Sequence, residues 1–282
     1  MRKTFFLFSL IIILATNCYS QPGILGSQDQ TVERITNIKR STVQILVNNA
    51  QSGTGFFVSQ DGMIITNWHV IDVGKQRIIG DFSNFKAVTY KNDTLELKLI
   101  NYLFSPKFIN EAKAFDYCVL SPKKKLKTEY FLNVGSSKET PEGTTVYTCG
   151  FPLNMKVSFI STGMLSTKYD ENILVNGKNY KRDLMYLDLT VNKGNSGGAL
   201  MVMGKTVKDD KVIGITTFII IPYGQYIKEV NDFIDENSKR GSIAIQGLDY
   251  LGYAKLVNDA LSSNSIGISG AISIDCVKEI IK

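Results

Sequence analysis

The sequence predicts an all-β protein built from short antiparallel strands. From Thr42 to Phe218, short segments rich in Val, Ile, Phe and Tyr are separated by turn residues, chiefly Gly, Asp, Asn and Pro. We see no helical pattern between these segments, whereas parallel strands need a connecting helix. The chain has 282 residues, of which 44% are apolar and 21% charged, enough for one large β domain or two small ones. These observations favour a barrel or a sandwich.

The first 20 residues have the pattern of a secretory signal peptide. Two basic residues precede an apolar run from Phe5 to Ala15, and a polar tail ends at the small residue Ser20. The apolar run is too short to span a membrane. We expect cleavage after Ser20 and export to the periplasm or the medium. The alternative is a lipoprotein anchored at Cys18, which Asn17 disfavours because a small residue usually precedes the lipidated cysteine.

The expected elements follow in order along the chain. Residues 28–39 are predicted to form a short helix, because Val32, Ile35 and Ile38 share one face. The Asp-Gly pair at 61–62 predicts a tight two-residue hairpin turn, since glycine supplies the positive φ that such a turn needs. Strands are expected at 43–47, 55–59, 63–66, 85–90, 95–102, 117–120, 144–149, 157–166, 185–191, 199–203, 211–218 and 266–274.

Two regions break the strand pattern. Residues 122–143 resemble a connection, so we expect the N-terminal helix and the first half at 21–123 and the second half at 140–282. Residues 221–265 carry amphipathic stripes and are predicted to be a helical insertion. Asp275 is predicted to cap a final short helix at the C-terminus.

Composition argues against several binding functions. The signal peptide carries two basic residues and no acidic ones, so its removal lowers the formal net charge from +6 to +4. Such a mild excess, without basic runs interleaved with aromatics, makes nucleic acid an unexpected partner. Cys118, Cys149 and Cys276 then remain, an odd number, and we expect Cys118 and Cys149 to be buried thiols. With one histidine and no paired Cys-X-X-Cys motif, no metal or other cofactor is expected.

Two short motifs carry the candidate chemistry. His69, the only histidine, lies in Thr-Asn-Trp-His-Val, and Ser196 lies downstream in Gly-Asn-Ser-Gly-Gly. Flanking glycines supply the tight backbone that a nucleophile loop needs, and a nucleophilic serine needs a base. If Ser196 is a nucleophile activated by an imidazole, His69 is the one imidazole that can serve.

These motifs resemble those of trypsin-like serine peptidases, most closely the bacterial HtrA-like branch. The segment 52–70 is similar to the hairpin that carries the base, and 194–200 is similar to the nucleophile loop. Asp116, which opens Asp-Tyr-Cys-Val-Leu, resembles the orienting aspartate. The order His, Asp, Ser is that of chymotrypsin. The resemblance implies two six-stranded antiparallel β-barrels of the chymotrypsin type, without a PDZ module.

The same resemblance implies a serine endopeptidase that acts on a protein or peptide substrate. Ser196 would attack the carbonyl carbon, His69 would take its proton, and Asp116 would orient the imidazole. The backbone N–H groups of Gly194 and Ser196 would form the oxyanion hole. Three other aspartates compete for the orienting role: Asp72, Asp93 and Asp188.

The expected substrate pocket accepts small to medium aliphatic side chains. Thr190 stands where a trypsin-type pocket has a carboxylate, and Thr216 stands where glutamyl endopeptidases have a histidine. Neither an Arg/Lys nor a Glu preference is therefore expected. The insertion 221–265 is expected to lie near this pocket. Its lining is predicted to comprise Thr190, Thr216, Thr217, Ile268 and Gly270.

Two other functional classes stay open. A catalytically silent binding protein on a trypsin-like scaffold would have the same fold without the activity. A single-barrel domain of another function is the third alternative. The sequence does not indicate the oligomeric state or the regulator.

Overall fold

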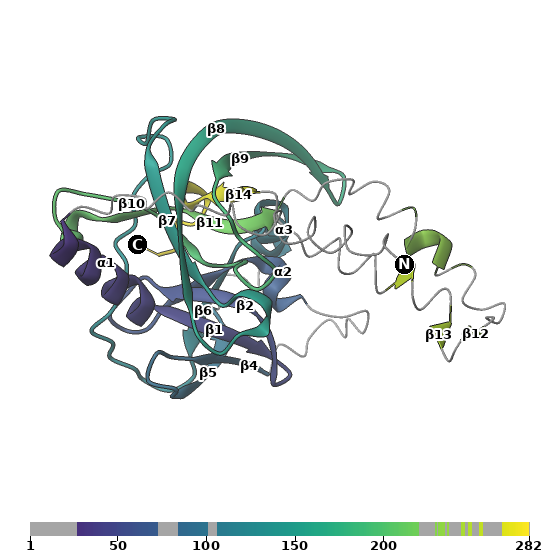
Figure 1. Cartoon of the computed structure of the whole chain (residues 1–282), viewed down its shortest axis with the longest axis horizontal. Helices are drawn as coiled ribbons and strands as arrows, with labels where there is room; N and C mark the ends of the chain where they lie inside the picture. The colour runs from purple at the N-terminus through teal and green to yellow at the C-terminus, as the bar shows by residue number, and fades with distance from the viewer. Residues whose placement is uncertain are drawn as a thin grey trace, which may run out of the picture.

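The computed structural model describes residues 27–72, 84–100, 106–219 and 267–281, together with 229, 231–234, 236, 244–245, 248–249 and 254–255. In this part of the chain the strands form two closed barrels of six strands each (Figure 1). The predicted all-β fold of two six-stranded antiparallel barrels is therefore confirmed. The signal-peptide prediction for residues 1–20 lies outside the described residues.

The first barrel closes in the order β1-β2-β3-β6-β5-β4. β4 pairs with β1, so this sheet has no open edge. In β1, Val43, Ile45 and Val47 are buried, as the two-residue period of a strand requires. Its strands are β1 (Thr42–Val47), β2 (Ala50–Phe57), β3 (Ile64–Thr66), β4 (Phe85–Val88), β5 (Thr94–Leu99) and β6 (Cys118–Pro122).

The second barrel closes in the order β10-β11-β14-β9-β8-β7, with β7 paired to β10. β14 completes it after the insertion, whose described residues include helical positions and a small sheet of β12 (Ala244–Ile245) and β13 (Leu248–Asp249). Most of the predicted insertion lies outside the described residues. The barrel strands are β7 (Thr145–Gly150), β8 (Phe159–Val175), β9 (Lys178–Asp188), β10 (Ala199–Val202), β11 (Lys211–Ile219) and β14 (Ile268–Ser273).

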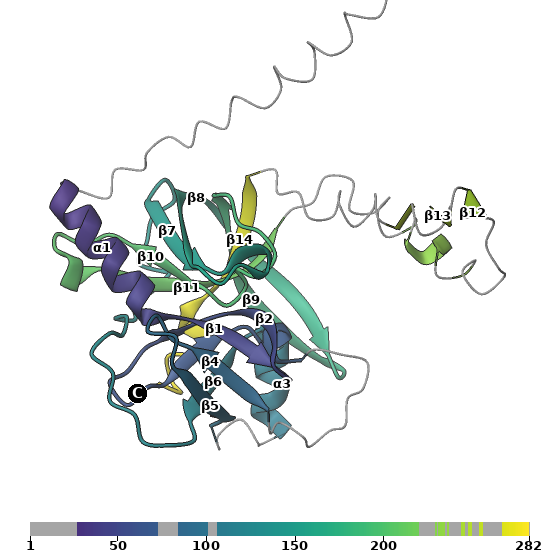
Figure 2. The same ribbon diagram turned by 60° about the horizontal axis from the view of Figure 1, so that its bottom comes forward.

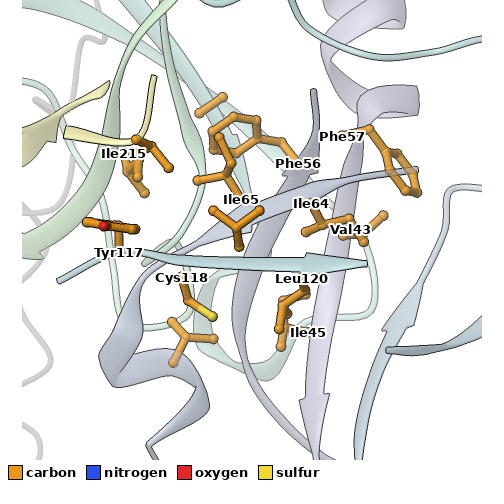
Figure 3. Packing of buried hydrophobic residues seen from close by; sticks show 14 of the residues in the cluster. Val43, Ile45, Phe56, Phe57, Ile64, Ile65, Tyr117, Cys118, Leu120 and Ile215 are labelled. Atoms are coloured by element: carbon orange, nitrogen blue, oxygen red, sulfur yellow. The ribbon is translucent and has the colours of Figure 1, made fainter. Parts of the chain in front are cut away.

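Apolar side chains fill the first barrel and continue into the second (Figure 3). Phe56 of β2, Ile64 of β3 and Leu120 of β6 are fully buried. Ile215 of β11 and Ile272 of β14, both from the second barrel, belong to the same cluster. Because close-packed interiors resist deformation, this shared cluster fixes the relative position of groups at the junction of the barrels.

The hairpin between β2 and β3 has a longer loop than predicted. Val58 N–H donates to the Met63 carbonyl at 2.9 Å, so residues 59–62 all lie in the loop. Gly62 has a φ of 85°, as expected of the glycine. Ser59 Oγ accepts from Met63 N–H at 3.0 Å. This side-chain bond closes a four-residue loop where a two-residue turn was expected, and the prediction of the turn type is wrong.

The arm formed by β8 and β9 is also longer than predicted. Val175 pairs with Lys178 around a two-residue turn in which Asn176 and Gly177 have φ values of 50° and 76°. Positive φ at both positions is typical of the type I′ turn that Asn-Gly favours. The outer half of the arm is mostly polar and exposed, which explains why its strand pattern was not apparent.

Two helices interrupt the strands, which corrects the expectation of an unbroken β region. They are α2 (Trp68–Ile71) and α3 (Pro106–Phe115). α3 lies beside the far end of the β8–β9 arm (Figure 2). Its sequence contains good helix formers at 111–114, namely Glu, Ala, Lys and Ala. The chain therefore enters β6 from a helix.

The N-terminal helix, α1 (Gln28–Ser41), is present as predicted, and Ile35 and Ile38 of the predicted apolar face pack on the core. Val32 is 59% exposed, while Arg34 and Ile38 are buried. The C-terminal prediction also needs correction. Ser273, rather than Asp275, is the N-cap of the last short helix, a 3-10 turn, because its hydroxyl accepts from Asp275 N–H at 3.1 Å.

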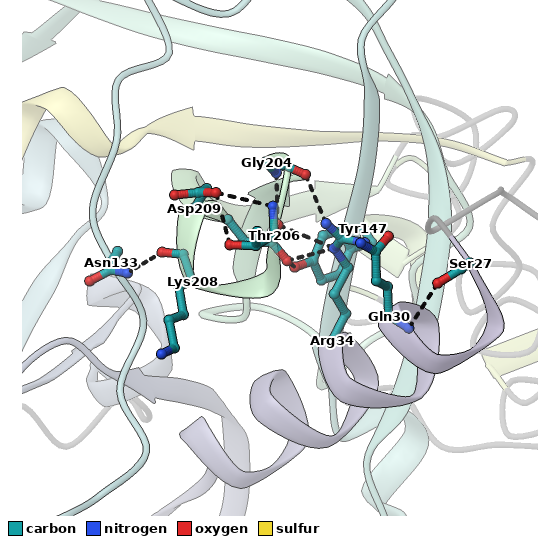
Figure 4. Close-up of polar contacts among 10 residues, drawn as sticks. Ser27, Gln30, Arg34, Asn133, Tyr147, Gly204, Thr206, Lys208 and Asp209 are labelled. Carbon is teal, nitrogen blue, oxygen red and sulfur yellow. Dashed lines mark hydrogen bonds and ion pairs between the residues drawn. The ribbon is translucent and has the colours of Figure 1, made fainter.

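The buried face of α1 is explained by an ion pair with the second barrel (Figure 4). Arg34 Nε donates to Asp210 Oδ2 at 2.9 Å, and its Nη2 donates to the Gly204 carbonyl at 2.8 Å. The Tyr147 hydroxyl donates to the same Asp210 oxygen at 2.7 Å. Both charged groups are 2% exposed, so these bonds replace water around them. α1 thereby ties the start of the first barrel to the second.

Candidate active site

His69 lies at the junction of the two barrels, directly after β3. The short helix α2 places it there, and its neighbour Trp68 is buried. Trp68 Nε1 donates to Asp72 Oδ2 at 3.3 Å, which gives this competing aspartate a structural role. Asn67 Nδ2 donates to the Asp116 carbonyl at 2.8 Å and links the histidine segment to the aspartate segment.

The imidazole of His69 and the carboxylate of Asp116 are in direct contact. His69 Nδ1 lies 2.8 Å from Asp116 Oδ2 and 3.1 Å from Oδ1. The backbone N–H of His69 also donates to Asp116 Oδ1 at 3.0 Å. A carboxylate at Nδ1 favours the tautomer that carries its proton there, which leaves Nε2 as an acceptor. The arrangement can take a proton at Nε2 and stabilise the resulting imidazolium.

Asp116 owes its position to the end of α3. Its φ is 56°, in the left-handed region, and Tyr117 N–H donates to the Ala112 carbonyl at 3.0 Å. These are the features of a Schellman motif, in which glycine usually occupies the left-handed position. An aspartate there costs about 1 kcal/mol relative to glycine. The motif turns the chain sharply and directs the Asp116 carboxylate at His69.

Thr217 has a role that the sequence did not reveal. Its hydroxyl donates to Asp116 Oδ2 at 2.5 Å, so the carboxylate is held from both barrels. We predicted Thr217 as a pocket residue, but its hydroxyl points to the aspartate instead. The two residues are far apart in sequence, and no local pattern indicates the pairing.

The loop around Ser196 depends on two glycines with positive φ. Asn195 N–H donates to the Asn192 carbonyl at 3.0 Å, and Gly194 has a φ of 99° within this turn. A Cβ on Gly194 would lie 2.3 Å from the Phe151 carbonyl oxygen. Gly197, with a φ of 89°, would place a Cβ 2.0 Å from the Thr54 carbonyl oxygen. No other residue type fits these two positions without moving the backbone.

Ser196 faces β11 in this structure. Its hydroxyl donates to the Thr217 carbonyl at 3.3 Å, and among the described contacts it forms no hydrogen bond with His69. The backbone N–H groups of Gly194 and Ser196 have no acceptor among the described hydrogen bonds. The Lys193 carbonyl accepts from Leu153 N–H at 2.7 Å, which holds the peptide group before Gly194.

The other predicted pocket residues occupy different environments. Thr190 is exposed, and Ile268 is 42% exposed at the start of β14. Gly270 is buried between Tyr186 and Phe218 in the strand register. Thr216 is 1% exposed and its hydroxyl lies 3.1 Å from that of Thr148, inside the barrel. The Thr216 side chain therefore does not line an open pocket, and that prediction is wrong.

The three cysteines among the described residues, Cys118, Cys149 and Cys276, are free thiols. Burial raises the pKa of Cys149 to about 11, and burial followed by the nearby Asp116 charge raises that of Cys118 well above its ordinary value. Both are therefore protonated, poorly reactive core residues at neutral pH. Within the described ranges, no three His, Cys, Asp or Glu side chains gather as a metal site, and no helix is both long and apolar enough to cross a membrane.

Comparison with known families identifies the domain. A family model described as a trypsin-like peptidase domain matches residues 53–215, more than half of the chain. The chain belongs to the trypsin-like peptidase family. The match begins within β2, includes His69, Asp116 and Ser196, and ends in β11.

The trypsin-like domain is similar to several curated proteins. It is 29% identical over 196 residues to the serine protease HTRA1 of Xenopus laevis, covering 68% of this chain and 38% of that protein. It is 29% identical over 181 residues to a probable periplasmic serine endoprotease, DegP-like, of Rickettsia conorii, covering 62% and 30%. The chain thus spans about a third of the length of these relatives.

Solved structures share the fold. The HtrA-type protease AlgW with a decapeptide superimposes with a TM-score of 0.55 at 17% identity, covering 89% of this trypsin-like chain and 66% of that one. The active form of the Rv3671c protease from M. tuberculosis gives 0.56 at 14% identity, covering 90% and 85%. At these identities the likeness concerns the fold alone.

Proposed function

We propose that this trypsin-like domain is an exported serine endopeptidase that hydrolyses peptide bonds through Ser196, His69 and Asp116. The observation that carries the proposal is the 2.8 Å contact of His69 Nδ1 with Asp116, which leaves Nε2 as the nitrogen that can act as a base. Family membership and the names of the relatives, serine protease and serine endoprotease, support the same activity.

The proposed mechanism assigns one task to each of these groups. Ser196 Oγ attacks the substrate carbonyl carbon while its proton passes to His69 Nε2, and the oxyanion accepts from the N–H groups of Gly194 and Ser196. The intermediate then breaks its C–N bond, and the imidazolium gives the proton to the leaving amine. Water hydrolyses the acyl-enzyme by the same steps, with His69 again acting as base. Asp116, held by Thr217, stabilises the imidazolium in each half-reaction.

Export and substrate preference are part of this proposal. The pattern of residues 1–20 and the similarity to a probable periplasmic relative support a periplasmic or secreted protein. Thr190 and Ile268 are exposed, neither is charged, and they support a preference for small to medium aliphatic side chains. A polypeptide is the expected substrate, and residues 221–265 are proposed to shape its choice.

A second function has one observation in its favour. Because Ser196 Oγ bonds to the Thr217 carbonyl rather than to His69, a domain locked in this state would bind polypeptides without cleaving them. This is the catalytically silent alternative.

A fluorophosphonate probe separates the two functions. We expect the folded wild-type protein to be labelled at Ser196, and we expect Ser196→Ala to lose labelling together with peptidase activity, by a factor on the order of 10⁶ in kcat. His69→Ala should fall comparably. A well-folded wild-type protein without labelling would favour the silent binder, whereas labelling that persists in Ser196→Ala would refute the assignment of the nucleophile.

A further inference from the structure

The arm formed by β8 and β9 reaches from the second barrel to α3, the helix directly before Asp116 (Figure 2). Tyr180 on this arm packs edge-on against Phe115, the last residue of α3, with ring centroids 5.8 Å apart and planes at 85°. Nearer the tip, Asn176 Nδ2 donates to Asn110 Oδ1 at 2.8 Å. The second barrel therefore contacts α3 at two points along its length.

Tyr180 is a buried residue on a largely exposed arm. It is 8% exposed, although its neighbours in β9 at 178, 179 and 181 are exposed. The Lys178 ammonium lies 4.9 Å from the centroid of the Tyr180 ring. Edge-to-face aromatic pairs have a preferred geometry, so such a contact fixes orientation as well as distance. The ring makes the contact with Phe115, and no hydrogen bond of the Tyr180 hydroxyl is among the described contacts.

The other side of α3 contacts the segment that carries the base. The Lys113 ammonium lies 5.5 Å from the centroid of the Trp68 ring, and Trp68 directly precedes His69. α3 thus lies between α2 and the β8–β9 arm. Because Asp116 follows α3 in a left-handed conformation, a small rotation of α3 would displace its carboxylate from His69 Nδ1.

Phe115 has space to move if Tyr180 is lost. An open pocket of roughly 190 Å³ lies beside it, and most of its other lining residues are polar or charged, among them Lys138, Arg182 and Asp183. Phe115 is therefore not closely packed on that side. Without the Tyr180 ring, the end of α3 would lose the contact that opposes movement into this space.

We propose that Tyr180 is a positioning residue for Asp116: its contact with Phe115 holds the end of α3 so that the carboxylate stays aligned with His69 Nδ1. The contact makes the catalytic pair of the first barrel depend on an arm of the second. The proposal rests on the proposed peptidase function, because alignment of Asp116 matters for turnover only if His69 is the base.

The test compares Tyr180→Leu with Tyr180→Phe, which keeps the ring, and with Tyr169→Leu, a control at a 57% exposed position of the same arm. Tyr180→Leu should lower kcat on a short chromogenic peptide about 3- to 10-fold with KM unchanged. Tyr180→Phe and Tyr169→Leu should retain wild-type kcat. Equal losses of kcat in Tyr180→Leu and Tyr180→Phe would overturn the proposal, because the Phe variant keeps the aromatic ring that contacts Phe115.

A second readout does not need turnover. His69 is the only imidazole in the chain, so its Nδ1–H proton gives one unambiguous NMR signal in ¹⁵N-histidine-labelled protein. Loosening of the Asp116 contact should shift this signal upfield in Tyr180→Leu and leave it unchanged in the two controls. An unchanged signal together with unchanged kcat in Tyr180→Leu would refute the positioning role.

Three further variants keep the test decisive. If Tyr180→Leu does not fold, Tyr180→Met retains apolar volume without the ring, and wild-type values in that variant overturn the proposal. Ser196→Ala and Asp116→Asn are measured in the same assay. If Asp116→Asn keeps full activity, the proposed function fails; if it loses activity while Tyr180→Leu does not, the positioning role alone fails.

Discussion

At the scale of single residues, the lack of a side chain at Gly194 permits the backbone conformation of the loop around Ser196. A Cβ at this position would lie 2.3 Å from the Phe151 carbonyl oxygen, and its φ of 99° is unfavourable for any other residue. We expect Gly194→Ala to rotate the peptide groups that would bind the oxyanion. Loss of one such donor lowers kcat about 10²- to 10³-fold. Hydrolysis of a peptide substrate by the purified variant measures this directly.

Gly143→Ala is the matched control for that substitution. Gly143 has a φ of 84°, but nothing lies within 4 Å of a Cβ built there. The two variants share the cost of a left-handed alanine, about 1–2 kcal/mol, and differ in the steric clash. Gly143→Ala should therefore lower the free energy of unfolding slightly and keep full activity. Equal activity in both variants would contradict the role given to the Gly194 backbone.

At the scale of elements, α1 is held by a buried ion pair as well as by Ile35 and Ile38 of its apolar stripe. Arg34→Met leaves the Asp210 carboxylate buried without its cation, and we expect a loss of about 3–5 kcal/mol in the free energy of unfolding. Urea denaturation measures it. Lys181→Met is the control, because the Lys181–Asp170 pair is exposed and such pairs contribute under about 1 kcal/mol. A comparable loss in both variants would contradict the anchoring role.

Elements with strong local patterns were predictable from the sequence, and elements defined by distant contacts were not. β1 and β10 follow apolar runs closely, and the glycine of the β2–β3 loop has the expected positive φ. α3 was missed because no glycine marks its end. Asp116 occupies the position where glycine usually stops a helix, so the residue that we propose orients His69 replaces the signal that would have revealed the helix.

The candidate site likewise contains residues that a local pattern indicates and residues whose roles depend on distant contacts. Glycine-flanked Ser196 and the unique His69 can be recognised in the sequence as motifs. A nucleophilic serine needs a base, which limits the residue types that can act with Ser196. Thr216 and Thr217 are adjacent and similar, yet one hydroxyl lies inside the barrel and the other on Asp116. The pairing of β11 with β14 shifts register between Thr216 and Phe218, so Thr217 lies at a bulge, where a strand can redirect a side chain.

At the scale of the whole molecule, Asp275 joins the connection between the barrels to the C-terminal turn. Its carboxylate accepts from Ser136 and Ser137 at 3.0 and 3.1 Å, and Lys278 lies 2.7 Å away. Partial burial by itself would raise the pKa of Asp275, but these bonds outweigh it and lower the pKa to about 2. The folded state therefore favours the ionised carboxylate.

Because the pKa of Asp275 is lower in the folded state, the stability of the protein decreases as the pH falls. The stabilisation is fully present above about pH 4, the ordinary range of an aspartate, and is lost as the pH falls through about 2. We expect Asp275→Asn to flatten the decrease in the free energy of unfolding between pH 4 and pH 2. Asp93→Asn, in an exposed loop, should leave the slope unchanged. Parallel slopes for Asp275→Asn and wild type would contradict the assignment.

The Arg34–Asp210 pair also has a consequence for the order in which the chain is made. Arg34 leaves the ribosome 176 residues before its partner. At about 5–20 residues per second, this corresponds to a delay of roughly 10–35 seconds. During that interval the first barrel can be complete while α1 carries a cation without its buried acceptor. The helix can therefore dock only late in biogenesis, when the strands that supply Asp210 have emerged and the second barrel begins to close.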